Sequence, residues 1–165
     1  MDAADDDVGI VVEDPRSDAA RACLRAYFAE LDDRFESGFD PAASISADAD
    51  ELIEPAGLLL VARLGGEPVG CGALKLHGAG PAELKRMWVA PNARGLGLGR
   101  RLLGELERHA IGHGVTTIRL ETNRRLVEAI ELYRASGYVE VTAFNDEPYA
   151  HHWFEKRVGD ETLRS

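Results

Sequence analysis

The segment WVAPNARGLGLGRR, residues 88–101, decides how the rest of the chain is interpreted. An apolar run ends at Pro91, three glycines follow at every second position, and a new apolar periodicity begins after them. Glycine has no Cβ, so the backbone at Gly95, Gly97 and Gly99 can approach a ligand closely and present its N–H groups. A helix that begins here adds unpaired N–H donors and a partial positive charge. The segment therefore predicts a site for a pyrophosphate.

Basic side chains accompany these glycines. The stretch 85–101 contains no acid and holds Lys85, Arg86, Arg94, Arg100 and Arg101. Arginine suits phosphate because its planar guanidinium donates two parallel hydrogen bonds. Two other phosphate loops are not matched, since no Lys-Ser/Thr pair follows the glycines and Arg100 occupies the third glycine position of a dinucleotide fingerprint. The alternative is that the glycines only permit a tight turn between a strand and a helix.

Working outward, the pattern upstream is that of a β-meander preceded by one strand and helical segments. Gly65-Gly66-Glu67 is a hairpin signal between two apolar runs, and Ser17 is an N-cap candidate. The expected elements are a strand at 9–13, a helix from Ser17 to Gly38, a short helix within 41–54, and strands at 57–64, 68–77 and 82–89.

Downstream of the glycines, segments whose apolar residues have helical spacing alternate with segments whose apolar residues have strand spacing. The expected elements are a helix at 99–112, a strand at 115–121, a helix at 125–136 and strands at 138–144 and 151–157. The predicted fold class is α/β, with a mixed central sheet of about six to seven strands in the order β-α-(α)-β-β-β-α-β-α-β-β and helices on both faces. We expect one domain over residues 9–158, a disordered acidic tail at 1–8 and a flexible tail at 159–165.

Composition excludes several classes of protein. The 165 residues are 45% hydrophobic with a net charge of −10, which argues against a nucleic-acid-binding protein. No apolar run approaches the 18 residues of a membrane span, and the start MDAADDD is acidic where a secretory signal is basic. A cytoplasmic location is expected. Cys23 and Cys71 form no metal-binding spacing, so we expect two core cysteines and no metal.

The glycine segment, read with its flanks, resembles a known motif. R-G-L-G-L-G, with E-L-K-R-M-W-V-A-P before it and L-L-G-E-L-E after it, is similar to the acetyl-CoA motif of the GNAT N-acetyltransferase superfamily. The family pattern Gln/Arg-x-x-Gly-x-Gly/Ala is matched by Arg94, Gly97 and Gly99. Farther on, R-L-E-T-N and A-I-E-L-Y-R-A-S-G-Y look like the next strand and helix of that family. The motifs cover residues 57–158, whereas 9–54 match in element order alone.

The resemblance implies acetyl-CoA as co-substrate and a primary amine as acceptor. Backbone groups of the turn would bind the coenzyme A pyrophosphate, and those of the preceding strand would pair with the pantetheine arm, with the amide of Val89 facing the thioester oxygen. Many members have an asparagine seven residues before the family tyrosine; this chain has Leu126 there, and Asn123 is the expected substitute. The implied cofactor residues are Met87, Val89, Arg94, Gly95, Leu96, Gly97, Leu98, Gly99, Arg100 and Asn123.

The chemistry is aminolysis of a thioester, which needs a base and an acid. A free alkylamine has a pKa of about 10.4 and a simple thiol one of about 8.5, so the amine must lose a proton and the departing thiolate gains one. By resemblance, Tyr133 is the acid; the alternative is a tyrosine that only packs. Glu83, six residues before Val89, is the candidate base, although it could instead form an ion pair with Lys85. His77, His151, His152 or water are rival bases.

The acceptor is less well defined by the sequence. Residues 1–54 hold 16 acids and 4 bases, which favours a cationic acceptor such as a polyamine, a lysine side chain or a cationic drug, while a protein N-terminus remains open. Two other functions remain open: a coenzyme-A-binding regulatory domain without turnover, and a transferase for another acyl-CoA. A homodimer is also open, since dimers are common in the family.

Overall fold

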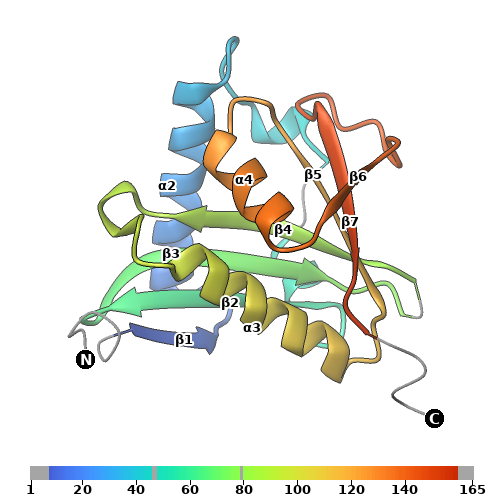
Figure 1. Ribbon diagram of the computed structural model, residues 1–165. Coiled ribbons are helices and arrows are strands. Elements are labelled where there is room, and N and C mark those ends of the chain that lie inside the picture. Colours follow the sequence, from blue (N-terminus) through green and yellow to red (C-terminus); the bar gives the residue numbers. More distant parts are fainter. Residues whose placement is uncertain (1–7, 46–47, 79, 160–165) are drawn as a thin grey trace.

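A seven-stranded mixed sheet runs through the molecule in the order β1-β2-β3-β4-β5-β7-β6 (Figure 1). The computed structural model describes residues 8–45, 48–78 and 80–159. The tails were predicted at 1–8 and 159–165, and all of their residues except Val8, which belongs to β1, and Gly159 lie outside the described residues. The strands are β1 Val8–Val12, β2 Gly57–Leu64, β3 Glu67–Lys75, β4 Ala82–Val89, β5 Thr117–Thr122, β6 Val139–Val141 and β7 His152–Arg157. Neighbours are antiparallel except β4 and β5, which are parallel. The predicted fold class is confirmed.

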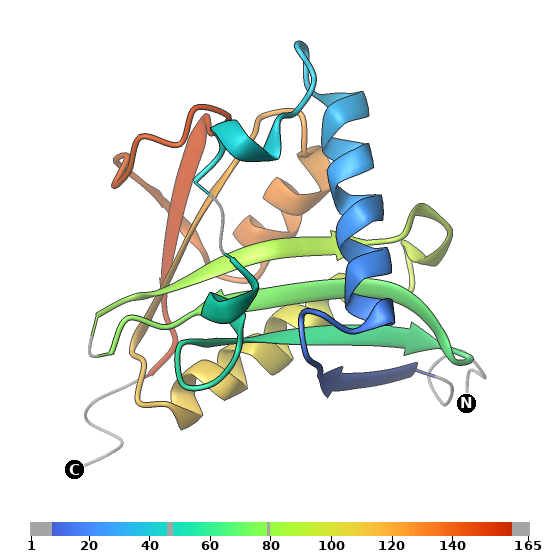
Figure 2. The same ribbon diagram turned by 180° about the vertical axis from the view of Figure 1, so that it is seen from behind.

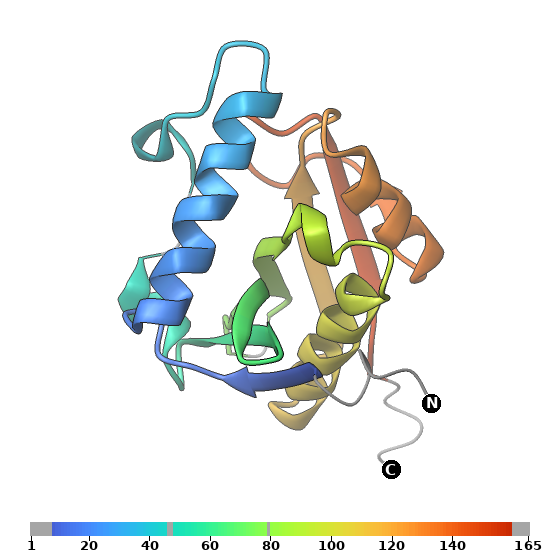
Figure 3. The same cartoon turned by 90° about the vertical axis from the view of Figure 1, so that its left-hand side faces the viewer.

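Helices cover both faces of the sheet, as expected. They are α2 Asp18–Arg34, α3 Leu98–Gly112 and α4 Val127–Ala135, with short 3₁₀ turns η1 Pro41–Ala43, η2 Ala49–Leu52 and η3 Pro91–Ala93. In Figure 3 the sheet is seen from its side, with α2 on one face and α3 and α4 on the other. The optional second helix within 41–54 is replaced by η1 and η2, because the segment offers too few consecutive helix-forming residues between its polar caps.

Local signals set the helix boundaries. Ser17 caps α2 as predicted, and its side chain accepts a hydrogen bond from the amide of Ala20. The helix ends at Arg34, one turn before the predicted stop at Gly38, and Phe35 turns its side chain inward to pack against Phe39 and Tyr149. A packing contact therefore ends the helix before the glycine is reached.

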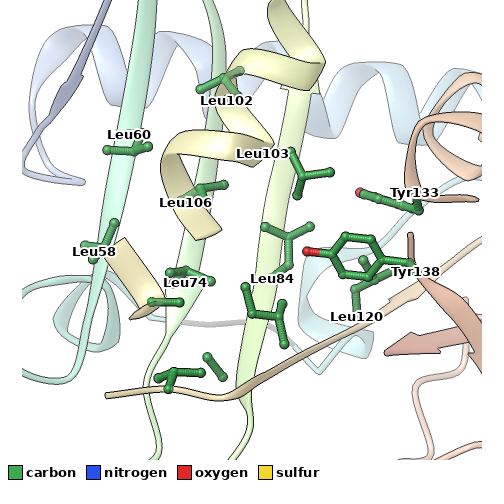
Figure 4. Close-up of a cluster of buried hydrophobic side chains, with 14 of the residues drawn as sticks. Leu58, Leu60, Leu74, Leu84, Leu102, Leu103, Leu106, Leu120, Tyr133 and Tyr138 are labelled. Atoms are coloured by element: carbon green, nitrogen blue, oxygen red, sulfur yellow. The ribbon is translucent and has the colours of Figure 1, made fainter. Parts of the chain in front are cut away.

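Two hydrophobic clusters lie on opposite faces of the sheet. Alternation along β2 sends Leu58 and Leu60 toward α3, and Leu59 and Val61 toward α2. On the α3 side, three buried leucines of the helix, Leu102, Leu103 and Leu106, cover strands β2 to β4 (Figure 4). Each buried leucine contributes about 1.5–3 kcal/mol relative to an exposed one, so these two clusters hold the layers together.

A β-bulge in β4 is the irregularity that shapes the site. Arg86 has φ 54°, and the register against β3 shifts between Cys71 and Ala73. Before the bulge Leu84 belongs to the α3 cluster, whereas after it Trp88 belongs to the α2 cluster. The bulge therefore exchanges the faces of the strand. Side chains at 83 and 85 lie on the α2 side, and Met87 packs on the α3 side.

Strands β4 and β5 diverge beyond their first residues. Their pairing consists of Ala82 with Ile118 and Glu83 with Arg119, and the later residues of β4 have no ladder partner in β5. The unpaired half of β4 leads directly into η3 and the glycine turn (Figure 1). This divergence opens the interior of the sheet next to the start of α3.

Candidate active site

A cleft of about 440 Å³ opens beside the end of β4 that has no ladder partner in β5. The end of β4, the glycine turn, the first turn of α3, one side of α4 and part of α2 form its walls. Eight of the ten predicted cofactor residues line this cleft: Met87, Val89, Arg94, Gly95, Gly97, Leu98, Gly99 and Arg100. Leu96 lies in the same turn with 40% of its surface exposed, outside the set that lines the cleft.

The turn has the backbone that an anion site requires. Gly95 and Gly97 have φ of +86° and +77°, a region that side chains with a Cβ rarely adopt. The first helical hydrogen bond runs from the amide of Arg101 to the carbonyl of Gly97, so the amides just before Arg101 have no partner within the helix. No side chain caps α3, and its first turn carries no acid. The helix start is thus free to bind an anion.

Gly99 has a packing role instead. A Cβ at this position would lie 3.1 Å from Leu132 Cδ2 and 3.9 Å from Val89 Cγ2. The third glycine therefore lets the start of α3 approach α4 and the end of β4 closely. The turn combines two glycines that set the backbone with one that allows close packing.

The strand end points an amide into the cleft. The amide of Ala90 donates to the carbonyl of Val69 on β3 at 2.7 Å. Successive N–H groups of a strand point to opposite sides, so the amide of Val89 points away from β3, toward the gap before β5. This is the direction expected of a donor to a ligand that lies between the two strands.

Arg94 is held in a way that the sequence did not reveal. Its guanidinium donates to both carboxylate oxygens of Glu30 on α2, at 2.6 and 2.8 Å, and its Nε donates to the carbonyl of Val89 at 3.1 Å. Arg34 lies 3.7 Å from Glu30 and 2.9 Å from Glu128 on α4. These four charged side chains form an ionic strap, Glu30–Arg94–Arg34–Glu128, that joins α2, the turn and α4 beside the cleft.

A second, smaller cavity of about 100 Å³ adjoins the cleft. The two share the lining residues Tyr27, Met87, Leu126 and Ala129, so a ligand that fills the cleft would reach the smaller cavity at these side chains. Tyr133 lines the smaller cavity and is 5% exposed. Burial raises the pKa of Tyr133, and the carboxylate of Glu121 adds to this effect. Its hydroxyl is therefore protonated at neutral pH, as a proton donor must be.

Glu83 lies in a chain of ionic contacts beside this cavity. It accepts from His77 Nε2 at 2.9 Å and lies 3.3 Å from Lys85 Nζ. Burial raises the pKa of Glu83, but the charges and hydrogen bonds of Lys85 and His77 outweigh it, so the pKa lies below its usual value. The ion pair with Lys85 that the sequence left open is present. Glu83 and His77 are not among the described residues that line the cavity.

Glu121, near the end of β5, is the carboxylate that does line the cavity. Its Oε1 accepts from Lys85 Nζ at 2.7 Å, while its Oε2 is buried with no hydrogen-bond partner. Only 8% of its side chain is exposed. Sequence reasoning missed this residue, although the alternation of R-L-E-T-N puts it opposite the buried Leu120, on the α2 side of the sheet.

The remaining predicted polar residues serve the surrounding loops. Asn123 lines the smaller cavity rather than the cleft; its amide donates to the carbonyl of Tyr149 at 2.7 Å and accepts from the amide of Arg125 at 2.8 Å. Its coenzyme contact stays a prediction. His151 accepts from the amide of Arg124, and His152 contacts Glu140. Neither histidine lines the cavity.

The acidity of the N-terminal half lies largely outside this site. Asp32 accepts from the amide of Phe39, and Asp40 caps the amide of Ala42. Among the described residues that line the smaller cavity, the acids are Glu121 and Glu147, both from the second half of the chain. Lys85 and Arg86 line this cavity too, so the acids of the N-terminal half do not set its charge.

The described ranges 8–45, 48–78 and 80–159 contain no group of three His, Cys, Asp or Glu side chains that is placed to hold a metal ion. No helix of the described part combines the length and apolar character needed to cross a membrane. Cys23 and Cys71 are both free and buried, as predicted for core residues.

Comparison with known proteins agrees with this geometry. The profile of the "Acetyltransferase (GNAT) family" matches residues 24–138. An IAA acetyltransferase of Azospirillum brasilense is 38% identical over 144 residues, covering 86% of this chain and 90% of that protein. An acetyltransferase of the GNAT family from Staphylococcus aureus MU50 superposes with a TM-score of 0.76 at 16% identity, over 92% of this chain and 99% of the other. A Bacillus anthracis protein crystallised with acetyl coenzyme A gives 0.57 at 24% identity, over 66% of each chain.

Proposed function

The chain belongs to the acetyltransferase (GNAT) family, and we propose that it transfers the acetyl group of acetyl-CoA to a primary amine by direct attack. Members of this family use acetyl-CoA, so the coenzyme is the expected co-substrate. The relative from Azospirillum brasilense is named as an acetyltransferase, which supports an enzyme rather than a binding domain. The single observation that carries the proposal is the cleft beside the end of β4, which the glycine turn lines and which adjoins the smaller cavity that Tyr133 lines.

The residues around the cleft suit the parts of the coenzyme. The free amides at the start of α3 and the side chain of Arg100 would bind the pyrophosphate, and the unpaired end of β4 would pair with the amides of pantetheine. The amide of Val89 points toward this gap and is the proposed donor to the thioester oxygen, where negative charge develops during attack. The four residues shared by both cavities mark where the thioester would lie.

The transfer forms one C–N bond and breaks one C–S bond. The neutral amine attacks the thioester carbon, the nitrogen gives a proton to a base, and the coenzyme leaves as a thiolate. Tyr133, kept protonated by burial, is the proposed donor of a proton to that thiolate. Its phenolate regains a proton from water between turnovers.

Glu121 is the proposed base. Glu121 lines the smaller cavity, where an acceptor amine would approach the thioester, and its buried Oε2 has no hydrogen-bond partner. Glu83, the candidate from sequence, is occupied by His77 and Lys85 and remains the alternative base. With either base, the amine must be neutral when it attacks, because an ammonium nitrogen has no lone pair with which to form a bond to the thioester carbon.

The test follows the release of coenzyme A thiol from acetyl-CoA in the presence of a panel of primary amines. We expect release that depends on both substrates, with the acetylated amine identified by mass spectrometry. Tight coenzyme binding by calorimetry without release for any amine would instead indicate a regulatory domain. Faster release from succinyl-CoA than from acetyl-CoA would show that the acyl group is a different one.

A further inference from the structure

A buried lysine lies between the two candidate bases. Lys85 Nζ is 2.7 Å from Glu121 Oε1 and 3.3 Å from Glu83 Oε2, and 9% of its side chain is exposed. The other oxygen of Glu83 lies 2.9 Å from His77 Nε2. The exposed fraction of the side chain falls from 40% at His77 to 22% at Glu83 and 8% at Glu121. Because Lys85 and Glu121 line the smaller cavity, these contacts form a charged chain that runs from the surface to that cavity.

The register of the sheet accounts for the inner contact of this chain. Glu83 is paired with Arg119 across β4 and β5, which puts Lys85 level with Glu121. The ladder does not continue to these two residues, so the ammonium and the carboxylate meet where the strands begin to diverge. Figure 2 looks onto this face of the sheet, with α2 in front of the strands. Lys85 therefore fixes a side chain of β5 from β4 at a level where the backbone ladder no longer does so.

The ammonium of Lys85 stays charged inside the fold. Burial lowers the pKa of Lys85, but the charges and hydrogen bonds of Glu121 and Glu83 outweigh it, so the pKa lies above its usual value. A cation beside a buried carboxylate favours the ionised form of that carboxylate, and a nearby anion opposes it. Glu121 thus has one neighbour that supports its charge and one, Glu83, that shares the same ammonium.

The two oxygens of Glu121 differ as a result. Oε1 accepts a hydrogen bond from Lys85, whereas Oε2 is buried and has no hydrogen-bond partner among the described residues. A buried polar atom without a partner is costly, so Oε2 is the oxygen expected to accept a hydrogen from a ligand. By binding Oε1, the lysine orients the carboxylate and determines which oxygen is left for that ligand.

The other charged or titratable side chains around Glu121 are the same in every variant of the test below. They are Tyr27 of α2, Arg86 of β4, Arg119 of β5, Tyr133 of α4, Glu147 of the 144–151 loop and Glu155 of β7. Burial raises the pKa of both tyrosines, so they are uncharged at neutral pH. Each carboxylate oxygen of Glu147 accepts a hydrogen bond, and Arg119 lies 3.7 Å from Glu155. A shift that follows a change in the charged chain is therefore assigned to that chain.

We propose that Lys85 is a positioning residue for the base: it holds Glu121 by Oε1, keeps the carboxylate ionised and leaves Oε2 to accept the proton of the amine. This inference rests on the proposed acetyl transfer and adds a residue to it. During transfer an N–H bond of the amine breaks and its proton goes to Oε2; the resulting carboxylic acid loses this proton to water between turnovers. Glu83 acts in the opposite sense, because it draws the same ammonium away from Glu121.

The pH profile of kcat, measured by thiol release from acetyl-CoA, tests this role. Lys85→Met should move the acid limb to higher pH by about one unit or more, because the carboxylate loses the cation that favours its ionised form. Glu83→Gln should move the limb to lower pH, because the ammonium then serves Glu121 alone. Lys85→Arg keeps the charge and should hold the limb within about half a unit of the wild type. Lys156→Met breaks a part-buried pair with Glu107 of α3 and should leave the limb in place.

A second measurement needs no turnover. It follows the ¹³C signal of the Glu121 carboxyl, which is assigned by its absence from Glu121→Gln; the midpoint of its titration should be highest in Lys85→Met and lowest in Glu83→Gln. An unmoved midpoint in both variants, or a loss of kcat in Lys85→Met that is equal at every pH, would overturn the role of Lys85. If Lys85→Met does not fold, the direction of the shift in Glu83→Gln decides, since that variant keeps the lysine. If no amine supports release, the proposed function fails, whereas the carboxyl signal still tests the lysine.

Discussion

At the scale of single residues, the proposed reaction needs one group that accepts a proton from the amine and one that gives a proton to the thiolate. Tyr133 is buried on α4 and lines the smaller cavity, and its hydroxyl stays protonated because burial disfavours the phenolate. Glu121 lines the same cavity, and its buried Oε2 has no hydrogen-bond partner. A candidate acid and a candidate base that line one small space suit a reaction that deprotonates an amine and protonates a thiolate.

Replacing the tyrosine separates chemistry from binding. Tyr133→Phe should lower kcat by about 10²–10³, since one positioned acid typically contributes 10²–10⁴ in rate, while the Kd for coenzyme A changes less than about threefold. Thiol release gives kcat and calorimetry gives Kd. Tyr138→Phe is the matched control, because Tyr138 is also buried but its hydroxyl donates to Glu107. Unchanged kcat in Tyr133→Phe would leave the residue with a packing role alone.

A pair of carboxylate variants identifies the base. Glu121→Gln should lower kcat by about 10²–10⁴ near neutral pH, whereas Glu83→Gln should lower it less than about tenfold. Activity of Glu121→Gln should recover as pH rises, because the fraction of neutral amine grows about tenfold per pH unit below its pKa of about 10.4. The pH profile of kcat checks both variants. A larger loss in Glu83→Gln than in Glu121→Gln would return the role to Glu83.

At the scale of elements, the glycine turn joins a diverging strand to an uncapped helix. Two of its glycines adopt positive φ, and the third allows α3 to pack against α4. The ionic strap then ties α2 and α4 to this turn through Arg94 and Arg34. The predicted phosphate partner Arg94 thus already has a carboxylate partner, and we expect backbone amides to contribute more than Arg94 to the proposed anion site.

A carboxylate in the turn should abolish coenzyme binding. Gly97→Glu is expected to raise the Kd for coenzyme A by at least 100-fold, because it places negative charge against the diphosphate at the helix start. Gly114→Glu is the matched control: it has the same positive φ of +81° and the same open surroundings, at the other end of α3. Calorimetry measures both. Near-native affinity in Gly97→Glu would contradict the anion site.

A variant of the ionic strap should instead bind coenzyme A more tightly. Glu30→Gln should lower the Kd for coenzyme A by about two- to tenfold, because it removes a negative charge from the cleft and frees Arg94 for phosphate. The gain should shrink as salt screens these charges. Glu105→Gln, in an exposed pair with Arg108, is the control. A weaker Kd in Glu30→Gln would show that the pair supports the turn structurally and does not compete with the ligand.

At the scale of the whole molecule, the fold keeps a cleft open by splitting its own sheet. The two hydrophobic clusters hold β2 to β4 between α2 and α3, and β5 to β7 against α4. Because β4 and β5 pair at Ala82 and Glu83 alone, the two halves separate at the other end of these strands, while the hydrophobic cluster on the α3 side still joins them. A ligand strand of amide groups can then take the place of the missing ladder.

Stability should depend on the leucines that join these layers. Leu106→Ala is expected to lower the free energy of unfolding by about 2–5 kcal/mol, because Leu106 is fully buried on α3 and packs over Gly72. Ile111→Ala, 41% exposed on the same helix, should cost less than about 1.5 kcal/mol. Urea denaturation measures both. A loss below about 1 kcal/mol in Leu106→Ala would contradict the assigned core.

The sequence by itself determined the order of the elements, the sheet class and the position of the glycine turn. These follow from signals between near neighbours: alternating apolar residues, the cap at Ser17 and glycines at positive φ. The predictions from sequence that the structure contradicts also came from signals between near neighbours. The segment 41–54, which is ambiguous in sequence, forms two 3₁₀ turns in place of the optional short helix, and α2 ends at Arg34, before the predicted stop at Gly38.

The tertiary structure alone decided which carboxylate lines the smaller cavity and which arginine of the turn is paired with a carboxylate. One extra residue at Arg86 exchanges the faces of β4, so simple alternation cannot place Glu83, Lys85 and Met87 relative to one another. The partners of Arg94 and Glu121 lie 64 and 36 residues away along the chain. Contacts of this range depend on how whole layers pack, and no periodicity in the sequence carries that information.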